Sequence, residues 1–268
     1  MSDATHYTPK LSSSRILIIG GSSGIGFAVA SACLEYGAHV AVSSSNASRV
    51  DSAVKRLQFS YPSKTANIHG LTVDLSKADT LEIELKSLLD ATISTIGGSG
   101  KKIDHVVFTA GDRLAMIPLK DMTMQNVLQA GQIRFFAPLM LAKYLPEYLE
   151  KSYKSSYTVT TGAVSEKPIP KWSVIGSYAG GHHSMVRNLA LDLKPIRVNG
   201  ISPGVVNTEL WRMNDEEREK IMKIHGEKLA TGRAGQPEDV AESYLALLKD
   251  YNMSGSMVRT DGGGLLGL

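Results

Sequence analysis

A glycine-rich turn near the start of the chain has the residue types and spacing to bind a phosphate group. It follows the apolar run Arg15–Ile19 and reads Gly-x-x-x-Gly-x-Gly from position 20 to position 26. A helix that begins with glycines exposes unpaired backbone N–H groups and the positive end of its dipole, where a pyrophosphate can bind. The lysine of a P-loop is absent, which disfavours a nucleoside triphosphatase. The residues expected to contact the pyrophosphate are Gly20, Ser22, Ser23, Gly24, Ile25 and Gly26.

The elements that must position this turn alternate regularly along the chain. Short apolar runs predict strands at 15–19, 39–43, 68–73, 103–108, 157–160, 197–202 and 257–260. Helices are predicted between them at 24–36, 48–60, 79–95, 123–150, 174–193, 214–229 and 237–249. This alternation predicts an α/β fold, a single Rossmann-type doubly wound domain with a mostly seven-stranded parallel sheet. We expect a flexible N-terminal segment over residues 1–14 and the domain over residues 15–268.

The composition of the chain indicates which partners and which cellular compartment to expect. The formal net charge of +3 is small and its charged residues are interspersed, so no nucleic-acid partner is expected. The single cysteine, Cys33, cannot form an internal disulfide and is expected to pack in the core. The chain has no run of about 18 apolar residues and no signal-peptide core, so we expect a cytoplasmic protein without membrane contact. No metal site is expected, because the adjacent His182 and His183 point in different directions on a helix.

Six further stretches accompany the turn. They are Val73-Asp74-Leu75, Thr109-Ala110-Gly111, Arg197-Val198-Asn199, the run 202–208, the run 235–241 and Asp261-Gly262-Gly263-Gly264. In order and spacing, the turn and these stretches resemble the short-chain dehydrogenase/reductase family over roughly residues 15–264. The resemblance implies a Rossmann-type fold, a nicotinamide cofactor, a small-molecule substrate and a homo-oligomer, either dimer or tetramer.

The same resemblance assigns further cofactor contacts. It implies that Asp74 contacts the adenine and that Thr208 contacts the pyrophosphate side of the nicotinamide half. The other residues that it places at the cofactor are Leu75, Thr109, Ala110, Gly111, Pro203, Gly204 and Val206.

The end of the second predicted strand favours NADP(H) over NAD. In NAD enzymes an acidic side chain at this place binds the ribose 2′-hydroxyl. Here the strand ends in Ser44, Ser45 and Asn46, which can donate hydrogen bonds to a 2′-phosphate where a carboxylate would repel it. Arg49 follows and either adds positive charge to this contact or is an exposed helix residue.

The acid–base residues of the family are missing from this chain. None of the tyrosines is followed by a lysine four positions later. In the register set by Leu189-Ala190, Ile175 takes the tyrosine position and Ala179 the lysine position. The serine position falls at Thr161-Gly162, and Arg134 takes the asparagine position of the preceding helix.

One alternative would restore an acid. Tyr178 and His182 are four residues apart and share a helix face, and a histidine could assist a tyrosine as a proton donor. Both lie three residues late against the family's register. The other interpretation has Tyr178 lining a pocket or packing, with His182 and His183 on the surface.

Two stretches resemble an atypical branch of the family, the fungal indole-alkaloid reductase/Diels–Alderases of the malbrancheamide and paraherquamide type. They are the run 156–162 and the Pro-x-Pro-x-Trp run 168–172. In that branch hydride goes to a carbon that is already cationic, so no acid is needed. The resemblance implies that Arg134 orients the substrate or cofactor, that Trp172 forms an aromatic wall and that Thr161 lies in the catalytic site.

One position departs from the branch. Its loop carries an aspartate where this chain has Ile169, and an isoleucine cannot anchor a cationic substrate. Glu166 either replaces this acid or is a solvated loop residue, and Asp112 is another candidate for the pocket.

Three functions fit these residues. The first is an NADPH-dependent oxidoreductase of natural-product metabolism that transfers hydride to an activated C=N or C=C of a bulky intermediate. The second is a non-redox isomerase or cyclase, similar to a pericyclase, in which bound NADP has a structural role. The third is a non-catalytic cofactor-binding scaffold.

Overall fold

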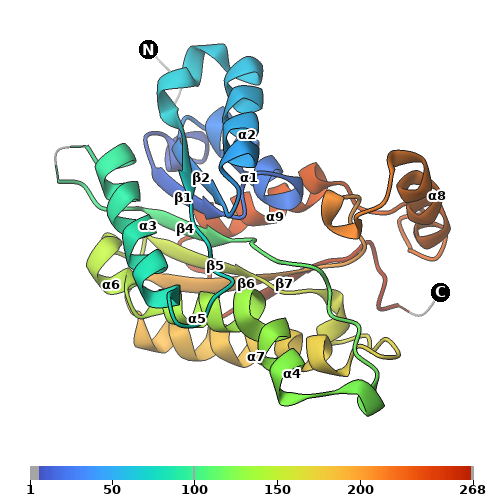
Figure 1. Ribbon diagram of the computed structural model, residues 1–268. Coiled ribbons are helices and arrows are strands. Elements are labelled where there is room, and N and C mark those ends of the chain that lie inside the picture. Colours follow the sequence, from blue (N-terminus) through green and yellow to red (C-terminus); the bar gives the residue numbers. More distant parts are fainter. Residues whose placement is uncertain (1–5, 99, 267–268) are drawn as a thin grey trace.

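A seven-stranded parallel sheet forms the centre of the molecule (Figure 1). The computed structural model describes residues 6–98 and 100–266. The strand order is β3-β2-β1-β4-β5-β6-β7, and every neighbouring pair is parallel. This confirms the predicted doubly wound Rossmann-type sheet. The strands are β1 (Arg15–Ile19), β2 (His39–Ser44), β3 (Ile68–Thr72), β4 (His105–Phe108), β5 (Ser156–Thr160), β6 (Arg197–Pro203) and β7 (Met257–Thr260).

Helices cover both faces of the sheet (Figure 1). The α-helices are α1 (Gly24–Glu35), α2 (Ala47–Ser60), α3 (Leu81–Ile96), α4 (Met124–Gly131), α5 (Ala137–Ala142), α6 (Leu145–Tyr148), α7 (Ser173–Asp192), α8 (Asp215–Gly226) and α9 (Pro237–Lys249). The short turns are 3-10 helices η1 (Thr8–Leu11), η2 (Pro62–Asn67), η3 (Leu119–Asp121), η5 (Ala163–Ser165) and η6 (Glu209–Trp211), and the π-helix η4 (Gln132–Phe136).

Side chains of β1 alternate between two apolar cores, one on each face. Leu17 and Ile19 pack in the core formed with α3, α5 and α7. Ile16 and Ile18 pack in the other core, formed with α1, α2 and α9. Successive side chains of a strand point to opposite faces, so an unbroken apolar run is what a strand covered on both sides requires. No described helix is both long and apolar enough to cross a membrane.

The long helix predicted over 123–150 is broken in a way that matters for the site. Between α4 and α5 the chain forms the π-helix η4, and Pro138 stands in the first turn of α5. A proline has no N–H, so Pro138 cannot donate to the carbonyl four residues earlier, that of Arg134. His182 of α7 donates to this carbonyl instead, with Nε2 2.9 Å from the oxygen. Single turns of π-helix often occur at functional sites.

The N-terminal segment packs against the domain before the first strand begins. Residues 8–11 form η1, and the side chain of Leu11 is fully buried. Lys10 donates from Nζ to the carbonyl of Lys249 at 2.9 Å. The packed structure therefore includes residues that precede Arg15, while residues 1–5 of the predicted flexible segment 1–14 lie outside the described residues.

The stretch Arg197-Val198-Asn199 has a structural role in the described part of the chain. The buried guanidinium of Arg197 donates to the carbonyls of Tyr153 at 2.8 Å and Leu247 at 2.7 Å. The amide of Asn199 donates to the carbonyl of Met253 at 2.7 Å. These contacts join β6 to α9 and to the segment before β7.

Candidate active site

The residues expected to bind a cofactor lie at or after the carboxyl ends of β1, β2, β3, β4 and β6. In parallel sheets ligands bind beyond this edge, at the point where the strand order reverses. Here the order reverses at β1, which lies between β2 and β4. Thr161 follows β5 at the same edge. The topology thus gathers turns that are far apart in the sequence.

The glycine turn is shaped by steric limits at three positions. Gly20 has a φ of +91° and Gly24 a φ of +52°, which side-chain-bearing residues rarely adopt. A Cβ on Gly26 would lie 2.4 Å from the carbonyl oxygen of Gly20 and 2.4 Å from the Thr109 hydroxyl. The amides of Gly20 and Gly21 donate to the carbonyl of Ser43 at 2.9 and 3.1 Å. These hydrogen bonds therefore hold the turn at the end of β2.

The N-terminus of α1 fits the pyrophosphate of a dinucleotide. Ser23 is the N-cap, its side chain makes no capping hydrogen bond within the described residues, and the first turn of α1 carries no acid. The first backbone N–H groups of the helix and its positive dipole end are thus available to an anion. Thr208 lies beside them, since its methyl carbon is 3.2 Å from where a Cβ of Gly24 would be.

Two residues that follow β4, Thr109 and Ala110, pack against this turn. The amide and the hydroxyl of Thr109 donate to the carbonyl of Ile19 at 2.8 and 3.0 Å. A Cβ on Gly20 would lie 2.5 Å from the backbone nitrogen of Ala110. Thr109 and Ala110 are therefore packed against the turn, and this packing explains the glycine at position 20.

Asp74 has the electrostatic state that an adenine contact needs. Its carboxylate accepts a hydrogen bond from the backbone amide of Ser76 at 2.9 Å. Donation from the hydroxyl and the amide of Ser76 lowers the pKa of Asp74, so the group is an ionised acceptor at neutral pH. The next carbonyl, that of Leu75, accepts from Gln132 of η4 at 3.1 Å.

The residues expected at a 2′-phosphate lie together after β2. The Asn46 side chain caps α2 by accepting from the backbone amide of Arg49 at 2.9 Å. The guanidinium of Arg49 reaches the hydroxyl of Ser45 at 3.4 Å. A cation and a hydroxyl thus stand side by side in an exposed place.

The two residues predicted to take the positions of the family's acid–base pair are apolar and buried. Ile175 and Ala179 of α7 are 7% and 6% exposed. The hydroxyl of Thr161 donates to the backbone carbonyl of Ala179 at 3.0 Å, so it joins β5 to α7. Trp172 is the half-buried residue that precedes α7. Neither position of the expected pair can donate a proton.

Arg134 is paired with Asp112. Its Nε lies 3.1 Å from a carboxylate oxygen of Asp112, and a terminal nitrogen donates to the backbone carbonyl of the same residue. Burial lowers the pKa of Arg134, and the Asp112 carboxylate opposes this shift. A Cβ on Gly111 would lie 2.8 Å from the guanidinium carbon. The guanidinium thus covers Gly111, a predicted cofactor residue, and its charge has a local counter-ion.

Tyr178 and His182 belong to an aromatic cluster between α7 and η4. The ring of Phe135 lies 5.1 Å from Tyr178 and 5.4 Å from His182, measured between centroids. The Tyr178 hydroxyl donates to the carbonyl of Val127 at 3.0 Å. His182 is 3% exposed, so the interpretation that placed it on the surface is wrong. Its Nε2 donates to the backbone carbonyl of Arg134, which holds the ring between α7 and η4.

Two buried histidines predict how stability depends on pH. Burial lowers the pKa of His182 to about 4 and that of His105 to about 4. In the unfolded chain a histidine titrates near ~6.5, so the unfolded state binds protons first as the pH falls. The free energy of unfolding should therefore be highest above ~6.5 and should fall between ~6.5 and ~4, by roughly 1 to 2 kcal/mol for each histidine at pH ~5. Urea titrations across this range measure the loss. His105→Gln and His182→Gln should each flatten the pH dependence, and an unchanged slope in both variants would contradict this.

The loop between β5 and α7 is anchored by polar contacts. Glu166 forms an ion pair with Arg259 of β7, with Oε2 3.2 Å from Nε, and this hydrogen bonding lowers the pKa of Glu166. Lys167 donates to the carbonyl of Gly264. Glu166 is thus held by a cation and is an anchor of the loop. Ile169, at the position of the branch's aspartate, is 43% exposed.

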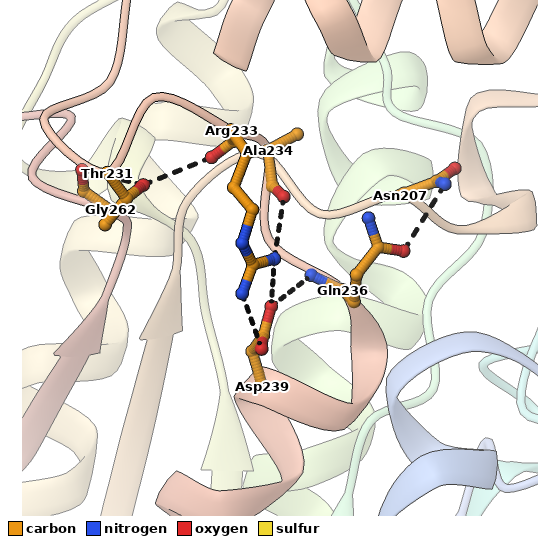
Figure 2. Close-up of polar contacts among 7 residues, drawn as sticks. All are labelled: Asn207, Thr231, Arg233, Ala234, Gln236, Asp239 and Gly262. Carbon is orange, nitrogen blue, oxygen red and sulfur yellow. Dashed lines mark hydrogen bonds and ion pairs between the residues drawn. The ribbon is translucent and has the colours of Figure 1, made fainter.

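A polar network fixes the segment after β6 (Figure 2). Arg233 and Asp239 form a two-point ion pair at 2.6 and 2.9 Å, and the backbone amide of Gln236 donates to Asp239 at 2.8 Å. Asn207 reaches Gln236 at 3.4 Å and accepts from Arg218 of α8 at 2.9 Å. The run 235–241, known from the sequence only as a matching stretch, therefore supports the segment that carries Thr208.

Metal ligands do not gather in the described ranges. No group of three or more histidine, cysteine, aspartate or glutamate side chains there could hold an ion.

The chain matches the family model of the SDR-like Rossmann domain over residues 7–267. It is 44% identical over 269 residues to the short-chain dehydrogenase/reductase fsr5 of Gibberella fujikuroi, which covers 99% of this chain and 100% of the relative. It is 39% identical over 254 residues to the short-chain dehydrogenase/reductase malC of Malbranchea aurantiaca, with 94% of each covered. The protein belongs to the short-chain dehydrogenase/reductase family, which confirms the resemblance found in its sequence.

A solved structure supports the same family membership. It is the MalC reductase/Diels–Alderase of Malbranchea aurantiaca, with a TM-score of 0.89, 39% identity, and coverage of 97% of this chain and 99% of that one. The family consists in general of oxidoreductases that bind a nicotinamide cofactor and small-molecule substrates.

Proposed function

We propose that this protein is an NADPH-dependent oxidoreductase that transfers hydride to an activated C=N or C=C bond without a protein acid. One observation carries the proposal. The nucleotide turn keeps its full geometry, while Ile175 and Ala179 are buried apolar residues where the family's proton donors are expected. Hydride transfer to a carbon that is already electrophilic depends on positioning, so such a site can lose its acid and keep its cofactor.

The cofactor site supports NADP(H). The bound nicotinamide supplies the hydride. The amides at the start of α1 hold the pyrophosphate, and the ionised Asp74 accepts from the adenine amino group. Arg49 and Ser45 hold the 2′-phosphate, since they form a pair of cation and hydroxyl at the end of β2.

The substrate is a bulky small molecule of natural-product metabolism. Trp172 forms a wall of its site, and Arg134, held by Asp112, orients the substrate. Glu166 is paired with Arg259, so it does not replace the aspartate of the branch. The site is therefore suited to an electrophile whose charge is small or is balanced within the substrate.

A second function is a cyclase or isomerase that acts on the same substrate with NADP as part of the pocket wall. The description of the similar structure as a reductase/Diels–Alderase favours it. It predicts tight NADPH binding without consumption of the cofactor.

The test is a fluorescence titration of the purified protein with NADPH and NADH. We expect micromolar NADPH binding and weaker NADH binding. Arg49→Ala should weaken NADPH about tenfold and leave NADH unchanged, because a charge-assisted hydrogen bond is worth about 1.5 to 3 kcal/mol. Lys55→Ala removes the same charge from an exposed position of α2 and is the control. If neither NADPH nor NADH binds, the proposal is overturned.

A further inference from the structure

A carboxylate from outside α1 reaches the glycine turn. Glu209 directly follows Thr208, at the start of η6. Its Oε2 lies 3.6 Å from where a Cβ of Gly24 would be, beside the Thr208 methyl carbon at 3.2 Å. Gly24 is the first residue of α1, so this anionic oxygen lies close to the end of the helix whose amides a pyrophosphate would use.

The electrostatics of this contact are clear. The first turn of α1 carries no acidic residue of its own, and the N-cap Ser23 does not cap it with its side chain within the described residues. A negative charge is stabilising at the N-terminus of a helix. Glu209 supplies such a charge from another element, as a phosphate would do. The two anions repel each other, so a phosphate bound here disfavours this position of the carboxylate.

We propose that the Glu209 carboxylate is an internal competitor for the cofactor's diphosphate, and that cofactor binding turns this side chain out of the glycine turn. The inference rests on the proposed function, because it takes NADPH as the ligand of the turn. It assigns Glu209 the role of lowering the affinity for the cofactor in the resting protein.

The surrounding segment allows the side chain to leave. Glu209 is exposed, so its carboxylate can turn into solvent without crossing a packed core. The backbone behind it is held: the indole N–H of Trp211 donates to the carbonyl of Val206 at 2.9 Å. Arg212 ends η6 with a φ of +51°, a conformation that costs energy for a residue other than glycine. The side chain of Glu209 can therefore be displaced while the backbone of η6 keeps its place.

The experiment compares NADPH affinity in the wild type, Glu209→Gln and Glu219→Gln by fluorescence titration at low and high salt. Glutamine keeps the size of the side chain and removes its charge. We expect Glu209→Gln to bind NADPH roughly two- to tenfold more tightly at low salt. The gain should shrink at high salt, because salt screens exposed charges. Glu219→Gln removes the same charge from an exposed position of α8 and should bind as the wild type does.

The outcomes separate this inference from the proposed function. If the wild type binds NADPH and Glu209→Gln binds it with equal or lower affinity, the competitor role is overturned and the proposed function stands. An equal gain in both variants also overturns it, because only the net charge would then matter. If neither the wild type nor Glu209→Gln binds NADPH, the proposed function fails and the inference fails with it.

Discussion

Gly26→Ala should abolish tight NADPH binding and destabilise the fold. The new methyl group would lie 2.4 Å from the Gly20 carbonyl oxygen and 2.4 Å from the Thr109 hydroxyl, and the first of these is backbone that cannot rotate away. The turn must therefore open at the place where we propose that the pyrophosphate binds. Overpacking of this kind costs about 1 to 3 kcal/mol, and the displaced amides should lower the affinity by at least about tenfold. Urea unfolding and NADPH titration measure the two effects.

Gly180→Ala is the matched control for this prediction. A Cβ at Gly180 of α7 would meet no atom within 4 Å. Alanine is a better helix former than glycine, so this variant should be neutral or more stable by up to about 1 kcal/mol. It should bind NADPH as the wild type does. Normal NADPH affinity in Gly26→Ala would show that the turn does not hold the cofactor.

The fold could be predicted from the sequence because its signals are local. The runs 16–19 and 106–108 are apolar without alternation, which is what strands covered on both faces need. The glycine turn could be predicted for the same reason, since all its residues lie within eight positions of the chain. Even there, the close approach of Ala110 to Gly20 depends on the pairing of β1 with β4.

The contacts of the candidate site could not be predicted in the same way. His182 is buried because it meets the carbonyl of Arg134, and the two residues are 48 positions apart. Glu166 and Arg259 are 93 positions apart, so nothing near Glu166 in the sequence shows that its charge is paired. Such partners are chosen by tertiary packing, which determines whether an ionisable residue is free to act. Pro138 was the usable signal for His182, since it frees a carbonyl that a buried donor must satisfy.

The same limit applies to Thr161. Its position after β5 is typical of the family's serine, and the sequence therefore predicts a catalytic role. The structure shows its hydroxyl proton donated to the carbonyl of Ala179. Its oxygen remains available as an acceptor, so its role in catalysis stays a prediction.

Arg134→Ala should abolish reduction of an activated acceptor while NADPH affinity stays within about threefold. The guanidinium lies over Gly111, a proposed cofactor residue, and Asp112 fixes its direction. Removal of one preorganised group of this kind lowers the rate of an enzyme by about 100-fold or more. The substitution leaves the start of α1, Asp74 and Arg49 intact, and these are the groups assigned to the cofactor. Loss of NADPH absorbance with a zwitterionic iminium acceptor, whose charge is balanced within the molecule, measures reduction. Nucleotide fluorescence measures affinity.

Two further variants decide what Arg134 does. Arg187→Ala removes an exposed arginine from α7 and should change neither quantity. Asp112→Asn removes the counter-ion of Arg134 but keeps the cation. If reduction needs the charge of the guanidinium, this variant should still reduce the acceptor. Its KM should rise, because the guanidinium has lost the partner that fixes its direction. If NADPH affinity collapses in Arg134→Ala, Arg134 is a ligand of the cofactor. If reduction survives in Arg134→Ala, the hydride acceptor needs only the cofactor and the apolar walls, and the cation serves to hold Asp112.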